Sequence, residues 1–479
     1  MFESSQYDGR KRCSFRVNAA RIDERSPTIL DGSFSLIEEY RGDLVSDVLV
    51  IAERARSAAL QMAKASAEAR NQAILAIAEA IDREKTQIMK ENSGDIQEAS
   101  KTRLAAPLLK RLRLDESKIE DLTRGLRVLV QLEDPVGKTL FSSEMDHRLE
   151  LYKVSCPIGV VGAIFESRPD VLVQIAALCL KSGNSVVLKG GAEAKRTNRF
   201  LAGILRKTIG QFSEIPKDSV QLIETRRDVA ALLKLDDYVD LLLPRGSSSL
   251  VTYVKETSRI PVLGHAEGIC HEYIDLHANL DMAVRICYDA KVQYPAVCNG
   301  MNTLLVHKKV ADTFLPMMSK EYQVAGVELR GDKGTRKILS QVKKAKEMDW
   351  STEYLDLVLN IRLVNSLQEA IDHVNRYGSH HTDGIITENT ENARKFLNEV
   401  DSAVVIHNAS TRFSDGYRFG FGAEVGISTG KIHARGPVGL DGLVTHKYVI
   451  AGSGQVVSSY IGDRAKHFTH RRLSKRWNP

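Results

Sequence analysis

The sequence predicts an α/β fold with two doubly wound domains, because short apolar runs alternate with helical segments in two separate series. The strand-like runs of the first series lie at 160–165, 185–189, 220–223, 238–243 and 260–263. Those of the second series lie at 303–306, 355–363, 384–387 and 403–406. Such alternation indicates mostly parallel sheets that are covered by helices on both faces. A chain of 479 residues also exceeds what one hydrophobic core usually supports, so two or three domains are expected.

Helical segments are predicted between these runs and ahead of them. In the two series they lie at 169–181, 193–209, 228–235, 248–257, 280–291, 312–322, 367–377 and 390–400. Ahead of them, residues 43–92 and 117–131 have helical spacing. One apolar face of the first of these regions comprises Ile74, Ile77, Ala78 and Ile81, as a helix packed on a core requires. Gly94 is expected to cap this region at its C-terminus.

Two strand-like segments, 139–154 and 443–457, lie outside both series. Isolated two-stranded ribbons are marginal in water, and open strand edges invite pairing. We therefore expect these segments to form a β flap that adds to the sheet of a neighbouring subunit in a homo-oligomer. The alternative is that both strands fold back on their own domain. Residues 1–42 show little apolar periodicity and are interpreted as an N-terminal extension of unknown role.

The composition is typical of a soluble globular protein, with 43% hydrophobic and 27% charged residues. No apolar run approaches the ~20 residues needed to span a bilayer, and no signal-peptide core follows the start. Six scattered cysteines without CxxC spacing argue against a disulfide framework or a zinc ribbon and fit a reducing cytosol, so a cytoplasmic location is expected. The excess of 67 basic over 61 acidic residues favours an anionic substrate or cofactor but is too diffuse for nucleic-acid binding.

Cys298 is the candidate nucleophile. It follows a polar, Pro-containing loop and precedes the strand-like run 303–306, a setting that can hold a thiol toward a cleft between domains. As a thiolate it is a strong nucleophile, and neighbouring dipoles or cations would depress its pKa. The alternative is a buried structural cysteine, which is the commoner fate of free cysteines.

Two strand ends in the first series are candidates for binding an extended anionic ligand. Lys189 is followed by Gly190 and Gly191, which permit close backbone approach, and the lysine can meet a phosphate or ribose. Gly246 and Ser247 end another strand and open a helix, where free N–H groups and the helix dipole favour phosphate. Neither stretch is a GxGxxG motif, and ordinary turn glycines and helix caps are the alternative.

Other polar residues lie where a substrate could be held. Arg168, at the end of the first strand, could bind a carboxylate or phosphate bidentately, or form a surface salt bridge with a neighbouring acidic residue. The glycine-rich segment 408–416 contributes three candidate headgroup ligands: Ser410, Thr411 and Arg412. His265 begins a stretch with Cys270 and His271 whose spacing matches no standard zinc pattern, so no metal site is expected. Packing or substrate contact at the domain junction is the preferred role for His265.

Several stretches together carry a resemblance. They include Phe-Glu-Ser-Arg-Pro-Asp (165–170), Leu-Pro-Arg-Gly (243–246), Gly-His-Ala-Glu-Gly-Ile-Cys-His (264–271), Tyr-Pro-Ala-Val-Cys-Asn-Gly-Met-Asn (294–302) and Asn-Ala-Ser-Thr-Arg-Phe-Ser-Asp-Gly (408–416). The chain resembles the gamma-glutamyl phosphate reductase (glutamate-5-semialdehyde dehydrogenase) family, a branch of the aldehyde dehydrogenase superfamily. It is most similar to the C-terminal half of the bifunctional delta-1-pyrroline-5-carboxylate synthases. Asn302 stands where the family commonly has a glutamate.

The resemblance implies NADPH-dependent reduction of L-glutamyl 5-phosphate to L-glutamate 5-semialdehyde, with release of phosphate, in proline biosynthesis. Cys298 would form a thioester, with Asn299 beside it among the catalytic residues. The oxyanion would be stabilised by the backbone N–H of Cys298 and by a donor near Ser167. Glu353 would contact the nicotinamide ribose, while Lys189, Gly246 and Ser247 would contact the adenosine and phosphate side of the cofactor. A separate glutamate 5-kinase could supply the substrate.

The resemblance also implies a division of the chain. Residues 43–135 and 156–261 would form the cofactor-binding domain, 262–430 the catalytic domain, 136–155 with 440–460 the oligomerisation flap, and 461–479 a tail. Two other functions remain open. A hydrolytic aldehyde dehydrogenase would need a general base, for which Glu267 is poorly placed in register. A non-catalytic scaffold subunit is disfavoured by the intact Cys298, Lys189 and Glu353.

Overall fold

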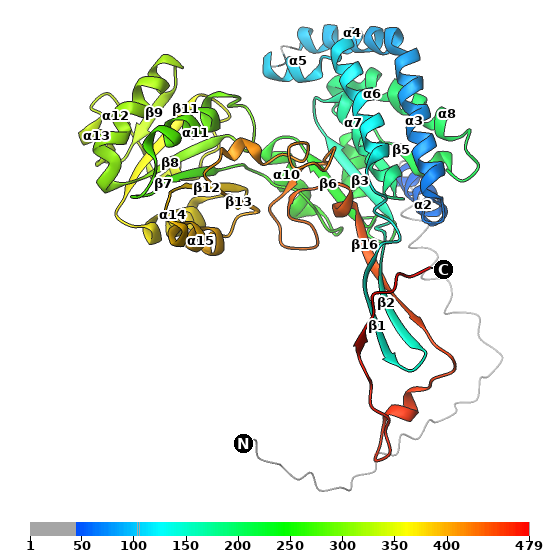
Figure 1. Cartoon of the computed structure of the whole chain (residues 1–479). Helices are drawn as coiled ribbons and strands as arrows, with labels where there is room; N and C mark the ends of the chain where they lie inside the picture. The colour runs from blue at the N-terminus through cyan, green and yellow to red at the C-terminus, as the bar shows by residue number, and fades with distance from the viewer. Residues whose placement is uncertain (1–44, 103, 105, 479) are drawn as a thin grey trace, which may run out of the picture. The chain divides into compact units, whose positions relative to one another are not determined.

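The computed structural model describes residues 45–478 except residues 103 and 105 (Figure 1). The extension predicted for residues 1–42 lies outside the described residues. Within them, no helix combines the length and the apolar character needed to cross a lipid bilayer.

The first part of the described chain is helical, as predicted. Its helices are α2 (Val45–Met62), α3 (Ala67–Arg83), α4 (Lys85–Lys101), α5 (Ala106–Leu112) and α6 (Glu116–Gln131). The expected apolar face of α3 is fully buried, and α3 packs against α6, α7 (Pro169–Lys181) and α8 (Lys195–Ile209). The expectation that Gly94 ends the helix is wrong, because Gly94 lies inside α4. A Cβ at this position would lie 2.8 Å from the Arg196 guanidinium, so the glycine permits close packing of α8.

The first series forms a four-stranded parallel sheet in the order β5-β4-β3-β6. Its strands are β3 (Val160–Phe165), β4 (Ser185–Lys189), β5 (Val220–Leu222) and β6 (Leu241–Arg245). Its helices are α7 (Pro169–Lys181), α8 (Lys195–Ile209), α9 (Arg226–Leu232) and α10 (Ser248–Thr257). The strand predicted at 260–263 is reduced to one bridge between Leu242 and Val262. Pro261 has no N–H to donate to a ladder, which limits pairing there.

The second series forms a seven-stranded parallel sheet in the order β10-β9-β11-β8-β7-β12-β13. Its strands are β7 (Cys270–Ile274), β8 (Met301–His307), β9 (Glu328–Gly331), β10 (Lys343–Lys344), β11 (Val358–Val364), β12 (Thr382–Ile386) and β13 (Val404–His407). Its helices are α11 (Leu280–Val292), α12 (Lys308–Val324), α13 (Thr335–Ile338), α14 (Leu367–Tyr377) and α15 (Thr390–Glu399). The sequence analysis missed β7, β9 and β10.

The strand-like segments outside both series form an antiparallel sheet in the order β16-β2-β1-β17. We call this sheet the flap, and Figure 1 shows β1, β2 and β16 running side by side. Its strands are β1 (Thr139–Asp146), β2 (Leu149–Pro157), β16 (Val444–Ala451) and β17 (Arg471–Arg472). The segment 461–479, which was predicted to be a tail, therefore contributes β17 as a flap strand. Trp477 near its end packs on Tyr152, with ring centroids 5.2 Å apart.

The remaining elements are short. A two-stranded antiparallel sheet joins β14 (Ile427–Ser428) to β15 (Gly436–Pro437). Short 3-10 helices lie at Ala192–Ala194 (η1), Lys217–Ser219 (η2), Glu347–Ser351 (η3), Thr411–Phe413 (η4), Leu440–Leu443 (η5) and Val457–Tyr460 (η6).

The flap exposes apolar side chains. Tyr448 and Ile450 of β16 are each 61% exposed, and alternation along the strand places them on the same face. Leu140 and Phe141 of β1 are also exposed. The prediction that this sheet joins a neighbouring subunit therefore has a specific surface on which it can be tested.

We expect Ile450→Glu to reduce the oligomer mass, because a buried apolar side chain contributes about 1.5–3 kcal/mol and a buried unpaired charge opposes association. Lys447→Glu, on the opposite face of the same exposed strand, is the control and should leave the mass unchanged. Light scattering measures both. A wild-type monomer, or an Ile450→Glu oligomer of unchanged mass and stability, would contradict the prediction.

Candidate active site

A cavity of about 370 Å³ lies where the carboxyl ends of β3 and β6 meet the loop that carries Cys298. The cavity brings together eight of the residues predicted from the sequence: Arg168, Gly246, Ser247, His265, Cys298, Asn299, Glu353 and Arg412. Residues at the carboxyl ends of parallel strands share one edge of the sheet, which explains how distant segments converge here.

The loop with Cys298 connects α11 to β8 and is held by Gly268. A Cβ on Gly268 would lie 2.0 Å from the carbonyl oxygen of Cys298, so only glycine allows this approach. Asn302 braces the same contact, because its Nδ2 donates to the carbonyl oxygens of Gly268 at 2.8 Å and Gly300 at 3.2 Å. Its Oδ1 accepts from the backbone N–H of Tyr354 at 3.3 Å. A carboxylate could not donate these two bonds, which gives Asn302 a structural role of its own.

The Cys298 thiol is not activated by its surroundings in the way that the sequence analysis expected. Burial, together with the carboxyl groups of Glu353 and Glu424, raises its pKa to about 12, against the opposing charge of Arg245. Desolvation of a thiolate outweighs one cation here. The resting side chain is therefore a neutral thiol, and a base or a bound ligand must accompany its ionisation.

Arg245 is a cavity residue that the sequence analysis overlooked. It ends β6, and its guanidinium has neither an ion pair nor a hydrogen bond to any residue in the described part of the chain. Burial lowers the pKa of Arg245, and the charge of Arg168 adds to this effect. A half-buried cation that no described residue pairs is available to an anion in the cavity, so this position favours an anionic ligand. The available signal was an arginine at the carboxyl end of a predicted strand.

Two carboxyl groups share the cavity with the thiol. Burial raises the pKa of Glu353 to about 7, although the N–H of Gly268 opposes the shift, and Glu353 Oε1 has no hydrogen-bond partner among the described residues. Burial also raises the pKa of Glu424, which accepts a hydrogen bond from the N–H of Gly416 at 2.8 Å. Glu353 therefore changes charge near neutral pH, where exposed glutamates are already ionised.

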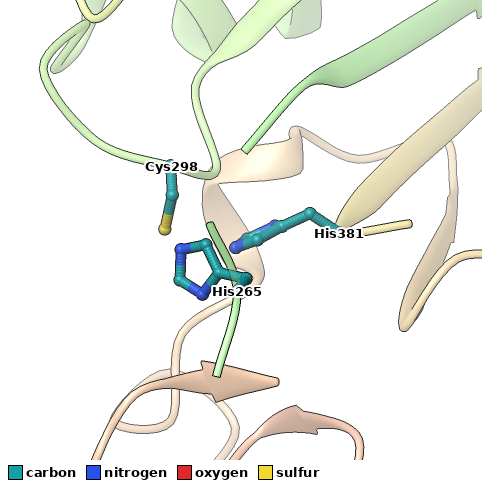
Figure 2. A group of neighbouring side chains, drawn as sticks. All are labelled: His265, Cys298 and His381. Carbon is teal, nitrogen blue, oxygen red and sulfur yellow. The ribbon is translucent and has the colours of Figure 1, made fainter. Parts of the chain in front are cut away.

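His265 lies beside the thiol, together with His381, which precedes β12 (Figure 2). The Nδ1 of His265 lies 2.7 Å from the carbonyl oxygen of Ile427. A carbonyl can only accept, so Nδ1 carries the proton and the lone pair lies on Nε2. Burial lowers the pKa of His265, so the ring is neutral. His381 is fully buried, and its ring meets that of His265 edge-on with centroids 4.9 Å apart.

Several other predicted site residues lie outside this cavity or have their polar groups hydrogen-bonded elsewhere. The hydroxyl of Ser167 donates to Glu193 at 2.7 Å, so it is not available there as an oxyanion donor. Ser410 and Thr411 are buried around η4, where Ser410 Oγ accepts from the N–H of Arg412 and the N–H of Thr411 donates to Glu272. Asn299 lines the cavity, but its Nδ2 donates to the carbonyl of Ser414 at 2.8 Å. Of the three candidates in the segment 408–416, Arg412 is the one that lines the cavity.

Comparison with known proteins identifies the family. The model of the aldehyde dehydrogenase family matches residues 36–337. A gamma-glutamyl phosphate reductase of Pelotomaculum thermopropionicum is 53% identical over 429 residues, covering 90% of this chain and 98% of the relative. One of Methanosarcina acetivorans is 51% identical over 439 residues, covering 90% and 98%. The chain belongs to the gamma-glutamyl phosphate reductase branch of the aldehyde dehydrogenase family. It is an oxidoreductase.

A solved structure supports the same assignment. The crystal structure of a gamma-glutamyl phosphate reductase from Thermotoga maritima is 40% identical and superposes with a TM-score of 0.84, covering 86% of this chain and 99% of that chain. The predicted aldehyde dehydrogenase-like α/β fold and the family resemblance are thus confirmed.

The residues expected on the cofactor side of this family member separate into two places. Ser247 caps α10, and its N–H donates a hydrogen bond at 2.7 Å to the carboxylate of Glu166. The N-terminus of α10 therefore already binds one anionic group, the side chain of Glu166. A Cβ on Gly246 would lie 2.3 Å from the same carboxylate. Gly190 and Gly191 line a separate cavity of about 10 Å³. The glycines and the N–H of Ser247 fit a cofactor phosphate, provided that Glu166 turns aside.

Lys189 ends β4 near the same edge of the first sheet. Burial lowers its pKa, while Glu193 and Glu166 oppose the shift. The lysine thus remains a half-buried cation near the residues expected to meet the cofactor, although it lines neither of the two cavities described above.

A second cavity of about 830 Å³ adjoins the other side of the Cys298 loop. It shares Arg111, Arg168, Ala296 and Val297 with the first cavity and adds Lys110 and Lys118. Arg168 forms an ion pair with Asp170 at 2.7 Å, which is the salt bridge given as the alternative in the sequence analysis. It nevertheless lines both cavities. An anionic molecule could therefore approach Cys298 from a side different from that of Gly246 and Ser247.

We expect Gly268→Ala to lower oxidoreductase activity by about 100-fold or more, because a displacement of the candidate nucleophile Cys298 by about 1 Å can cost that much. Gly203→Ala is the matched control, since a Cβ at this exposed position of α8 would meet no atom within 4 Å. Activity and thermal unfolding should be measured on both variants. A folded Gly268→Ala protein with wild-type activity would contradict the role of this contact.

Glu353 should impose a pH dependence on stability. Its folded pKa of about 7 exceeds the ordinary value of 4.5, so its protonated form stabilises the fold below pH 4.5, and this contribution is lost as pH rises through 7. Glu353→Gln cannot ionise, so the variant does not lose this contribution to stability as pH rises. The Tm of the variant minus that of the wild type should therefore increase from pH 5 to about pH 8. An unchanged difference across that range would show that Glu353 ionises normally.

Proposed function

We propose that this chain reduces L-glutamyl 5-phosphate to L-glutamate 5-semialdehyde with NADPH and releases phosphate, as a step of proline biosynthesis. One observation carries the proposal: the guanidinium of Arg245, which no described residue pairs or hydrogen-bonds, lines the same cavity as Cys298. An acyl phosphate brings to such a cavity both a carbonyl for the thiol and an anion for the arginine. The names of the curated relatives support this substrate.

The first chemical step is attack of Cys298 Sγ on the acyl carbon of the substrate. A C–S bond forms, the bond from carbon to the phosphate oxygen breaks, and a thioester remains on Cys298. The thiol proton passes to the lone pair of His265 Nε2 and from there to the departing phosphate. Arg245 compensates the charge of the phosphate, which is already a good leaving group and needs little further acid help.

A bound NADPH supplies the hydride that reduces this thioester. The residues that would hold it are Ser247 at the start of α10, Gly246 beside it, Lys189, and Glu353 at the ribose. Collapse of the tetrahedral adduct on Cys298 releases the aldehyde and a thiolate, which takes a proton from water. The oxyanion would be stabilised by the backbone N–H of Cys298.

The hydrolytic aldehyde dehydrogenase remains the second candidate, because one observation favours it. Glu353 lines the same cavity, has a pKa of about 7 and keeps Oε1 without a partner among the described residues, as a general base for water would. Glu267, the residue weighed from the sequence, is exposed. The phosphate dependence of the reaction separates the two functions, and any turnover excludes a scaffold.

We further propose that the reaction takes place in the cytoplasm, in a homo-oligomer that uses the flap, with a separate glutamate 5-kinase supplying the labile acyl phosphate. The five described cysteines are all free, which suits a reducing compartment. The exposed apolar face of the flap supports the oligomer.

The test runs the reaction backwards, with glutamate semialdehyde and NADP⁺, and follows NADPH absorbance as phosphate is titrated. Wild-type turnover should require phosphate, or arsenate in its place, because phosphate must release the thioester. Arg245→Met should raise the phosphate concentration for half-maximal rate by at least about tenfold, the loss expected for one charge-assisted contact.

Cys298→Ser is the control and should abolish turnover while leaving NADPH binding nearly unchanged. Steady NADP⁺ reduction in phosphate-free buffer would favour the hydrolytic function. Activity of Cys298→Ser within tenfold of wild type would remove the nucleophile from the mechanism.

A further inference from the structure

Two imidazoles and one thiol converge beside the cavity from three distant segments. The ligand atoms of His265, Cys298 and His381 all lie within 4.8 Å of one another. In Figure 2 the sulfur of Cys298 and a nitrogen of each ring point toward the space between the three side chains. The sequence analysis expected no metal site, because it considered only the residues adjacent to His265 in the chain.

The rings are held as metal-binding histidines usually are. His265 donates from Nδ1 to the carbonyl of Ile427, which leaves the lone pair of Nε2 directed toward Cys298. His381 Nδ1 lies 2.9 Å from the hydroxyl of Thr382. Its Nε2 is buried and has no hydrogen-bond partner in the described part of the chain. Partners on the far ring nitrogen fix the orientation of a metal ligand.

An unpartnered buried nitrogen is the independent observation that points to a ligand. The whole His381 side chain is excluded from bulk solvent. Leaving such a group unpaired is costly, and an electrophile in the space between the three side chains would repay that cost. His381 has no part in the reaction proposed above, which uses His265 and Cys298.

We propose that His265, Cys298 and His381 bind Zn²⁺ and that the bound ion reversibly blocks the nucleophile. Two imidazole nitrogens and one thiolate sulfur are a ligand set that Zn²⁺ prefers, and a water would complete a tetrahedron. Binding replaces the thiol proton by the metal, so one Zn²⁺ enters and one proton leaves. Since the metal competes with that proton, affinity rises with pH.

The geometry requires a modest contraction. Zn–S and Zn–N bonds of about 2.3 and 2.0–2.1 Å place tetrahedral ligand atoms roughly 3.3–3.8 Å apart. The distances between the ligand atoms must therefore shorten by up to about 1.5 Å, and rotation of the half-buried Cys298 side chain on its loop contributes to this closure. His381, immediately before the buried strand β12, is the more rigid ligand.

The test uses Co²⁺ as a spectroscopic probe on the metal-free, full-length protein. One equivalent should produce a thiolate-to-cobalt charge-transfer band with the visible bands of a tetrahedral ion, and Zn²⁺ should displace it. Cys298→Ser should lose the charge-transfer band, while Cys156→Ser, the half-buried cysteine of β2, should keep it. Absence of the band in wild type, or its survival in Cys298→Ser, overturns the proposal.

The histidines are tested in the same assay. His381→Gln and the half-buried His265→Gln should each weaken Co²⁺ binding at least about tenfold, and His277→Gln, outside the cluster, should not. His265→Gln keeps the test decisive if His381→Gln does not fold. Unchanged affinity in His265→Gln overturns the assignment of the ligands.

Alkylation of Cys298 tests whether the bound metal blocks the nucleophile. This inhibitory role of the metal rests on the proposed function. Zn²⁺ should slow alkylation of Cys298 and stop turnover, and chelation should restore both. If Co²⁺ binds through Cys298 but the protein shows no phosphate-dependent turnover, the metal site stands and the proposed function fails. If turnover is normal but no charge-transfer band forms, the metal site alone fails.

Discussion

The close approach of Gly268 to the backbone of Cys298 is the contact on which the site depends. It leaves no room for a side chain, and it brings the segment with His265 directly against the loop with Cys298. Asn302 stabilises the contact by donating a hydrogen bond to the Gly268 carbonyl, and it accepts another from the N–H of Tyr354, the residue after Glu353. Nucleophile, imidazole and carboxyl group are therefore placed by one backbone approach, which rigid neighbouring strands make reproducible.

The electrostatics around Cys298 favour a resting thiol. Burial outweighs the cation of Arg245, so the pKa of Cys298 rises to about 12, and the same burial keeps His265 neutral. In the proposed reaction an anionic substrate would change this balance, because its phosphate would pair with Arg245 and its carbonyl would receive the sulfur electrons as the proton leaves. A neutral resting thiol also resists oxidation and stray alkylation, which follow thiolate character.

Periodicity in the sequence was enough to predict both parallel sheets, because apolar strands such as β3 and β8 are buried on both faces. It missed β7, in which His271 and Glu272 are fully buried although polar; the Nδ1 of His271 is bonded to Asp383 at 2.7 Å. Cys298 and the family could be recognised from motifs. The grouping of Arg245, Glu424 and His381 around the thiol could not, because long-range folding brings these residues together and no local spacing records it. The hydrogen bond from Ser167 to Glu193 is likewise a tertiary contact that the local sequence does not reveal.

The central claim is that Cys298 carries the acyl group between phosphate and hydride transfer. Its most direct test is mass spectrometry of the Cys298 peptide after wild-type protein is mixed with glutamate semialdehyde and NADP⁺ without phosphate and quenched in acid. The account predicts a glutamyl thioester on Cys298 alone, which disappears when phosphate is added before the quench. An unmodified Cys298 in a sample that has formed one NADPH per chain would contradict it.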